Sequence, residues 1–225
     1  LEKFTIDAPD ENPFDFKIVY FTRDLDGDPE LMGRILGDVL KQNDLKGYTV
    51  MNYVSSHDDG WPFDKKREKP FESGTKLLLA PGISQVYYGD ESARSLDIAG
   101  TNGDATLRSL MNWDDIKNNA TTKEVLTHWQ KLGQFRKNHP AIGAGIHKAF
   151  PVNGYVFGRI YSNGNYSDKV LIGLNLNKGV KEISTESLFA EGEKIRDFYS
   201  GKTATVTGGK VAIDSEFEIV LIEKL

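Results

Sequence analysis

The sequence predicts an α/β fold over residues 1–146, followed by an all-β fold over residues 147–225. In the first part, short apolar runs alternate with helical segments, as expected of βα units. In the second part the predicted elements are strands alone, separated by turn signals such as Asn163-Gly164 and Gly208-Gly209. The chain is therefore expected to hold two domains, the second a small antiparallel β-sandwich with strands such as 155–161 and 217–221.

The first 48 residues contain two predicted elements. Residues 14–25 are ambiguous, because their apolar residues have helical spacing whereas Ile18-Val19-Tyr20-Phe21 alone favours a strand. Asp28-Pro29-Glu30 predicts the start of a helix, with an N-cap residue followed by proline at the first helical position. The aspartates at 24, 26 and 28 suggest calcium, but the glycine and glutamate positions of an EF-hand loop are not matched. Capping and solvation are therefore their favoured roles.

The next elements form a strand, helix, strand unit, with strands predicted over residues 49–55 and 83–88 and a helix over about 71–80. A capping box at residues 121–124 predicts the start of a long helix that ends before Pro140. His128 and Trp129 lie on the apolar stripe of this helix, so we expect them to pack rather than to react. The whole stripe comprises Val125, His128, Trp129, Leu132, Phe135 and Arg136.

Residues 53–58, Tyr-Val-Ser-Ser-His-Asp, carry the most informative signal in the chain. An apolar strand runs directly into His57 and Asp58 at the place where it should end. In a (β/α)8 TIM barrel the reacting side chains lie at the carboxyl ends of the strands, so this pair fits an active site. A surface turn rich in serine and aspartate would give a similar pattern. Other stretches are needed to decide between the two.

Three stretches match the patterns of one enzyme family in the correct order. Residues 53–58 are similar to an aromatic-apolar-x-Asn-His-Asp pattern, with Ser56 in place of Asn. Residues 81–91 resemble a last barrel strand and its exit, Gly-Ile-Pro-x-x-Tyr-Tyr-Gly-x-Glu, with Ser84 in place of Pro. Residues 104–114 resemble an Asp-x-x-x-Arg run followed by Met-x-Trp. The patterns are those of the α-amylase family of glycoside hydrolases, which the chain therefore resembles.

The resemblance implies the last strands of a partial TIM barrel followed by a β-sandwich, and a retaining hydrolase of α-1,4-glucosidic bonds in starch or maltodextrins. It makes Asp58 the carboxylate that stabilises the transition state and His57 a donor to the same sugar. Asp104 and Arg108 match positions that contact sugars further along the substrate, although a structural salt bridge is an equal alternative. Trp61 is a candidate aromatic platform for a sugar ring. Glu91 is expected to be structural.

Two groups that the reaction needs are not matched. Retention requires two carboxyl groups about 5 to 5.5 Å apart, yet neither the family's Gly-x-Arg-x-Asp nucleophile pattern nor its acid glutamate occurs before Tyr53. We therefore expect a C-terminal fragment that is inactive alone and associates with the missing N-terminal part of the barrel or with a second copy. Alternatives within the family are a neopullulanase or cyclomaltodextrinase, an α-1,6-glucosidase and a glucosyl transferase. A noncatalytic carbohydrate-binding module is the alternative from another class.

Composition excludes several other classes of function. The net charge of -5 argues against a nucleic-acid partner, and no apolar stretch approaches the roughly 20 residues needed to span a bilayer. There is no cysteine, which excludes disulfides and thiolate metal sites. No cofactor site is visible in this chain, although calcium is common in the resembled family and is possible in the complete enzyme. The resemblance weakly favours periplasmic or extracellular placement.

Overall fold

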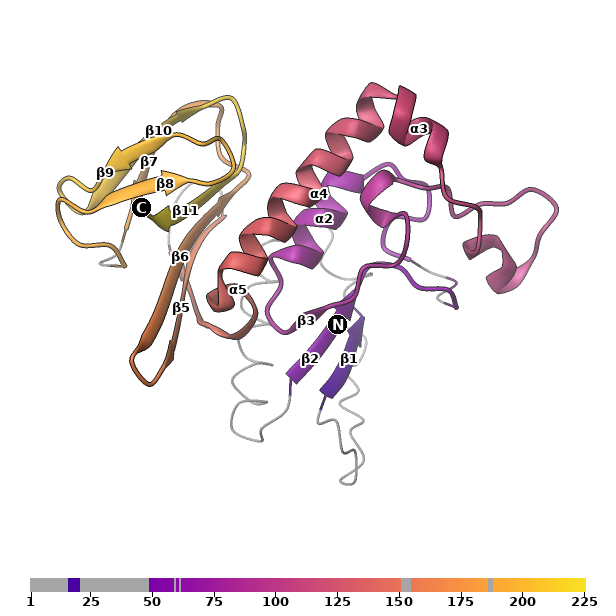
Figure 1. Cartoon of the computed structure of the whole chain (residues 1–225), viewed down its shortest axis with the longest axis horizontal. Coiled ribbons are helices and arrows are strands. Elements are labelled where there is room, and N and C mark those ends of the chain that lie inside the picture. The colour runs from indigo at the N-terminus through magenta and orange to yellow at the C-terminus, as the bar shows by residue number, and fades with distance from the viewer. Residues whose placement is uncertain (1–15, 21–48, 59, 61, 151–154, 186–187) are drawn as a thin grey trace. The chain divides into compact units, whose positions relative to one another are not determined.

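The computed structural model of the chain describes residues 16–20, 49–58, 60, 62–150, 155–185 and 188–225 (Figure 1). The chain groups into two compact units that divide between Gln134 and Phe135. The domain boundary at residue 146, which was inferred from the change of pattern, stays a prediction. Within the described part, no helix is both long enough and apolar enough to cross a membrane.

A three-stranded parallel sheet lies in the first unit, with the strand order β1 (Phe16–Tyr20), β2 (Thr49–Tyr53) and β3 (Ile83–Ser84). The ambiguous segment at 14–25 thus contains a strand. Helix α2 (Pro70–Leu78) connects β2 to β3, which confirms the predicted strand, helix, strand unit. The helix predicted from Asp28, with its neighbouring aspartates, lies outside the described residues.

The strand predicted over residues 83–88 is wrong in its length, because only two residues of β3 pair with β2. Ser84 lies opposite Asn52, and β2 itself ends one residue later, so in the described part of the chain the ladder stops after the Gln85 amide, which donates to the Asn52 carbonyl at 2.8 Å. The buried Asn52 amide strengthens this short joint by donating hydrogen bonds to the backbone oxygens of Pro81 (2.6 Å) and Ile83 (3.2 Å). Ser84, which replaces the expected proline, donates to the Leu77 carbonyl (2.8 Å) and so ties β3 to α2.

Helix α4 (Ala120–Asn138) buries the predicted stripe, including Trp129 and Leu132. The indole of Trp129 donates to the Pro70 carbonyl at 2.9 Å, and its ring lies against Gly74 of α2 so closely that a Cβ there would come within 2.9 Å. The predicted capping box is wrong, because the helix begins earlier and the Asn119 side chain caps it by accepting from the Thr122 amide (3.0 Å). The other short helices of this unit are η1 (Asp90–Ser92), η2 (Gly103–Leu107) and α3 (Trp113–Asn118).

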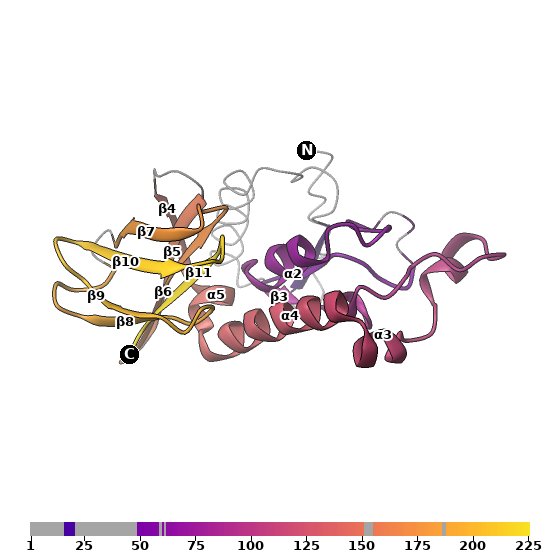
Figure 2. The ribbon, with the colours of Figure 1, turned by 90° about the horizontal axis from the view of Figure 1, so that it is seen from above.

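The strands of the second unit are antiparallel, as the sequence predicted (Figure 2). A six-stranded sheet has the order β4-β5-β6-β11-β8-β9, and a two-stranded sheet pairs β10 with β7. The elements in chain order are α5 (Pro140–Ala144), β4 (Ile146–Phe150), β5 (Tyr155–Asn163), β6 (Tyr166–Leu174), β7 (Gly179–Ser184), β8 (Lys194–Asp197), β9 (Thr203–Thr205), β10 (Lys210–Ser215) and β11 (Val220–Lys224).

Both sheets of this unit contribute side chains to one apolar core. Ile183 and Ile213 come from the small sheet, and Leu171 and Ile222 from the large one. The turns at residues 163–164 and 208–209 occur as predicted, with positive φ at the glycines. The last strand begins later than predicted, because residues 216–218 are exposed and pairing starts only at the buried Val220.

Candidate active site

The chain changes from buried to exposed four residues after the end of β2. Ser55 and Ser56 are buried, whereas the side chains of His57 and Asp58 are 62% and 61% exposed. The Phe63 amide donates to the Val54 carbonyl at 2.9 Å and so fixes the return of the loop. The predicted pair therefore lies at a strand end where a dissolved molecule can reach it.

Ser56 holds the carboxylate of Asp58. Its hydroxyl donates to Oδ1 of Asp58 at 2.8 Å, and the Asp58 amide lies 3.4 Å from the same hydroxyl oxygen. Nε2 of His57 lies 3.6 Å from the other carboxylate oxygen, in a pair too exposed to contribute much to stability. Ser56 stands where the resembled pattern has Asn, and its hydroxyl supplies a donor to the neighbouring carboxylate.

Of the other predicted site residues, Arg108 contacts the His57–Asp58 pair. Its Nε donates to the His57 carbonyl at 3.2 Å. Asp104 lies exposed in the first turn of η2, and in the part of the chain that the structure describes no ion pair joins it to Arg108. Trp61 lies outside the described residues. The roles assigned to all five residues stay predictions.

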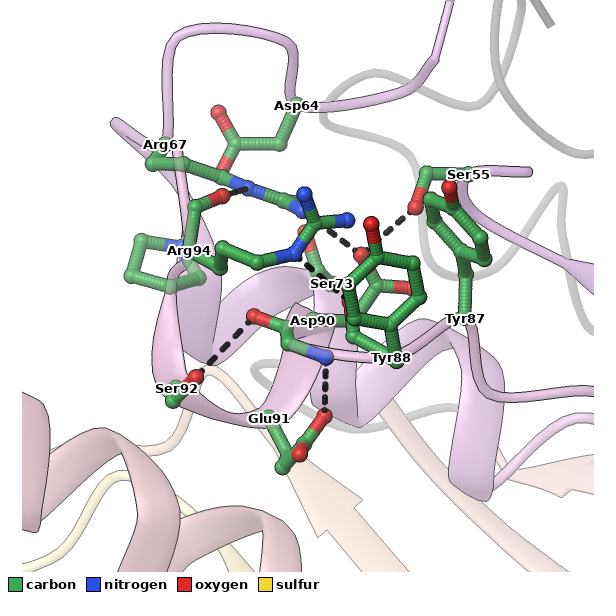
Figure 3. Close-up of polar contacts among 12 residues, drawn as sticks. Ser55, Asp64, Arg67, Ser73, Tyr87, Tyr88, Asp90, Glu91, Ser92 and Arg94 are labelled. Carbon is green, nitrogen blue, oxygen red and sulfur yellow. Dashed lines mark hydrogen bonds and ion pairs between the residues drawn. The ribbon is translucent and has the colours of Figure 1, made fainter. Parts of the chain in front are cut away.

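A buried polar cluster next to the strand end was not predicted from the sequence (Figure 3). Asp90, which is 1% exposed, accepts hydrogen bonds on Oδ1 from the Ser55 hydroxyl (2.6 Å) and from Nη2 of Arg67 (2.8 Å). The Nε of Arg67 also donates to the Arg94 carbonyl at 2.7 Å. A signal was present, since Asp90 follows one predicted strand much as Asp58 follows another.

Arg94 forms the second half of this cluster. Its buried guanidinium donates from Nε to the Tyr88 carbonyl (2.8 Å) and from Nη1 to the carbonyls of Leu107 (3.3 Å) and Ser109 (3.1 Å). It also lies 3.8 Å from the centroid of the Tyr88 ring, a cation–π distance. Arg94 therefore joins the exit of β3 to the segment that carries Arg108.

Close packing around Arg94 depends on a glycine. A Cβ at Gly89 would come within 2.5 Å of the Arg94 side chain, and Gly89 has φ +85°. The half-buried Glu91 accepts from the Gly89 amide at 3.0 Å, and its expected structural role stays a prediction. The turn after β3 is thus fixed by local contacts.

Among the described residues of the first unit, His128 and Tyr87 have shifted pKa values for structural reasons. Burial lowers the pKa of His128 to about 4, and its Nε2 lies 2.9 Å from the Phe71 carbonyl. Burial raises the pKa of Tyr87, whose hydroxyl donates to the Leu107 carbonyl at 3.1 Å. His128 thus packs, as its place on the helix stripe predicted. Within the described residues, no group of three His, Cys, Asp or Glu side chains gathers to hold a metal ion, so calcium in a complete enzyme stays a prediction.

Comparison with known proteins gives the family. No protein-family model matches the chain. Over 129 residues the chain is 40% identical to the periplasmic α-amylase of Escherichia coli (strain K12), an alignment that covers 57% of this chain and 18% of that protein. Over 196 residues it is 30% identical to the amylopullulanase of Thermoanaerobacter thermohydrosulfuricus, covering 74% of this chain and 12% of that protein. The chain belongs to the α-amylase family of glycoside hydrolases.

Solved α-amylase-family structures share the fold at low sequence identity. A variant of AmyP in complex with maltotriose matches 85% of this chain with a TM-score of 0.60 and 14% identity. The α-amylase of Geobacillus thermoleovorans, complexed with acarbose, matches 85% with a TM-score of 0.57 and 20% identity. This α-amylase-family chain spans 44% and 43% of those two structures, and 18% and 12% of the two curated relatives.

Proposed function

We propose that the chain carries the transition-state-stabilising part of the active site of a retaining α-glucan hydrolase, which cleaves α-1,4-glucosidic bonds in starch or maltodextrins. The observation that carries the proposal is the Asp58 carboxylate, exposed five residues after the end of the parallel strand β2 and held by Ser56 at 2.8 Å. Membership of the family supplies the reaction class. The maltotriose and acarbose complexes of similar folds support an α-glucan substrate.

Asp58 suits this role because of the charge that the reaction develops. The sugar flattens toward an oxocarbenium ion as the bond breaks, and its ring hydroxyls become better donors. An ionised carboxylate accepts such bonds strongly, because charge-assisted hydrogen bonds are short. One oxygen of Asp58 is held by Ser56, and the other, which lies 3.6 Å from Nε2 of His57 on the exposed turn, is proposed to accept from the sugar. His57 is proposed to donate to the same sugar, and Arg108, Asp104 and Trp61 to contact neighbouring sugars.

The nucleophile and the general acid are assigned to a part of the barrel that this chain does not supply. The Gly-x-Arg-x-Asp pattern is absent before Tyr53. The exposed edge of the parallel sheet supports association with such a part or with a second copy, since Ile83 of β3 is 46% exposed. The 225-residue chain alone is therefore expected to release no reducing sugar from starch, and measurable release would contradict this assignment.

The test of Asp58 uses the natural polypeptide that contains this chain together with the nucleophile and acid. Asp58→Asn keeps the shape of the side chain and removes its charge, so kcat on maltoheptaose should fall by about a hundredfold or more, with a smaller change in KM. Asp214→Asn is the matched control, because Asp214 is exposed on β10. Near-normal turnover of the Asp58 variant would refute the role.

Cleavage of α-1,6 bonds is a second candidate activity. It is favoured by the relative named amylopullulanase and by the fold shared with a pullulanase complexed with maltotriose (TM-score 0.58, 15% identity). The products released from maltoheptaose, pullulan and cyclodextrin would distinguish the two linkages, and would also reveal transfer to another sugar.

Placement of the natural polypeptide in the periplasm is proposed because the Escherichia coli relative is named a periplasmic α-amylase. Fractionation of cells that express the natural polypeptide would test it, with the enzyme expected in the osmotic-shock fluid.

A further inference from the structure

Ser55, Asp90 and Arg67 form a buried chain of polar contacts beside the strand end (Figure 3). The Arg67–Asp90 pair has side chains only 8% and 0% exposed. Both hydrogen bonds to Asp90 end on Oδ1, while its Oδ2 is buried and accepts none from the described residues. Burying an ion pair with an incompletely bonded carboxylate costs more than packing apolar groups of the same size. Stability alone therefore gives a poor account of this cluster.

Backbone strain accompanies the same contacts. Arg67 has φ +58°, in the left-handed region that residues other than glycine seldom adopt. Such a conformation persists where surrounding contacts enforce it. Arg67 has those contacts, because its Nε and Nη2 bond to the Arg94 carbonyl and to Asp90.

Two fixed points enclose Ser56, which holds Asp58. On one side the Ser55 hydroxyl is fixed by Asp90, and on the other the His57 carbonyl is fixed by Arg108. The two points belong to one framework. Arg67 bonds to the Arg94 carbonyl, and the Arg94 guanidinium bonds to the carbonyls of the residues on both sides of Arg108, namely Leu107 and Ser109.

We propose that Asp90, held by Arg67, is a positioning residue that acts through Ser55 to set the direction of Asp58. The inference rests on the proposed role of Asp58. By fixing Ser55, a buried residue two positions after the end of β2, Asp90 constrains the direction in which the next three residues continue. Transition-state stabilisation depends on groups placed in advance, and a small misplacement lowers the rate even when the fold is intact.

Ser55→Ala is the decisive variant, because it disconnects Asp90 from the strand end and leaves the Arg67–Asp90 pair in place. In the natural polypeptide, kcat on maltoheptaose should fall about ten- to a hundredfold while KM stays within about twofold. Ser92→Ala is the matched control. Ser92 is equally buried, and its hydroxyl bonds to Oδ1 of Asn112 at 2.7 Å, whereas the Ser55 hydroxyl bonds to Asp90.

The nature of the contact is tested by two substitutions of Asp90. Asp90→Asn keeps an oxygen that accepts from Ser55 and Arg67, whereas Asp90→Leu has a similar size and accepts nothing. At equal folded fraction, measured by circular dichroism, the asparagine variant should retain more kcat than the leucine variant. Hydrogen exchange on the 225-residue chain gives a readout independent of activity, in which Ser55→Ala, but not Ser92→Ala, should speed exchange of the amides at 56–58.

The outcomes separate the two proposals. If the wild-type polypeptide and Ser92→Ala hydrolyse maltoheptaose and Ser55→Ala does so equally well, Asp90 has no positioning role, whatever the fate of Asp58. If Ser55→Ala and Ser92→Ala lose activity only in proportion to lost folded protein, the cluster is merely structural. A wild-type polypeptide without hydrolytic activity would overturn the proposed function and this inference with it.

Discussion

The Ser56 hydroxyl donates a hydrogen bond to Oδ1 of Asp58 over 2.8 Å, so one of the two residues that depart from the family patterns directly contacts the residue expected to matter most. Without this bond, the exposed carboxylate would be free to rotate. Its placement before substrate binding therefore depends on one short neighbouring side chain.

The turnover of a Ser56 variant should therefore depend on whether the new side chain can donate a hydrogen bond to Asp58. Ser56→Ala removes the donor, and we expect kcat on maltoheptaose to fall about three- to tenfold, as for loss of one ordinary hydrogen bond, because the carboxylate is exposed to water. Ser56→Asn restores a donor and matches the resembled pattern, so it should stay close to wild type. Steady-state kinetics of the natural polypeptide would check both, and equal rates for the alanine and asparagine variants would contradict the donor role.

Gly74 and Gly133 should respond oppositely to alanine. A Cβ at Gly74 would lie 2.9 Å from the Trp129 ring, so Gly74→Ala should lower the free energy of unfolding by about 1–3 kcal/mol. Gly133 lies in α4 with nothing within 4 Å of an added Cβ, so Gly133→Ala should raise it by up to about 1 kcal/mol through helix propensity. Urea denaturation would measure both changes. A neutral Gly74 variant would show that the indole can move aside.

His128 should make stability depend on pH. Its folded pKa of about 4 lies below the ordinary value of 6.5, so the unfolded chain binds a proton more readily between these values. The free energy of unfolding should therefore fall as pH decreases from 6.5 toward 4, by about 2–3 kcal/mol from this group.

The contribution of His128 is isolated by comparing wild type with His128→Gln, which keeps a donor for the Phe71 carbonyl and does not titrate. His147, whose pKa burial lowers to about 3, titrates in both proteins and cancels in the difference. Urea denaturation at pH 7 and 4.5 is the measurement. The same loss of stability in both proteins would exclude His128 as its source.

Glu223 on β11 bonds to β8 directly and to β6 through His139. Its Oε2 lies 2.6 Å from Nε2 of His139, its Oε1 accepts from Nε of Arg196 at 2.7 Å, and the other ring nitrogen of His139 lies 2.8 Å from Asp168. Glu223→Gln should lower the free energy of unfolding by about 2–3 kcal/mol, since hydrogen bonds to a buried charge are lost. The exposed Glu218→Gln is the control, and equal melting temperatures would contradict this account.

Elements with a strong repeating pattern could be predicted from the sequence. The sequence correctly predicted the buried stripe of α4, which includes Trp129 and Leu132, and the order of strand and helix around α2. Both were predictable because burial of one face of an element imposes a regular spacing of apolar residues. Boundaries were less predictable. Asn119 and Thr121 are both good N-cap residues two positions apart, so the choice between them depends on where the helix packs. The length of β3 depends on where its partner strand ends, which its own residues do not encode.

The candidate site was predictable only where its residues are neighbours in sequence. His57 and Asp58 come soon after the strand predicted over 49–55, which in the structure ends at Tyr53, and the pattern points to them. The Ser55–Asp90 and Arg67–Asp90 contacts join residues 35 and 23 positions apart. No spacing rule relates such residues, because the folding of the chain between them sets their distance. The contact of Arg108 with His57 could not be predicted either, because it ends on a backbone carbonyl, a group that every residue has.

The two-residue pairing of β3 has a consequence for how this strand is aligned in the sheet. So short a ladder does little to define how far along β2 its neighbour lies, and the Asn52 amide adds that definition by bonding to the carbonyls of Pro81 and Ile83. These hydrogen bonds end on main-chain oxygens, so they do not depend on which side chains residues 81 and 83 carry. Asn52 thus fixes the alignment of β3 with β2 through main-chain contacts. A different side chain in β3, such as Ser84 in place of the expected proline, therefore need not displace the turn that begins at Asp90.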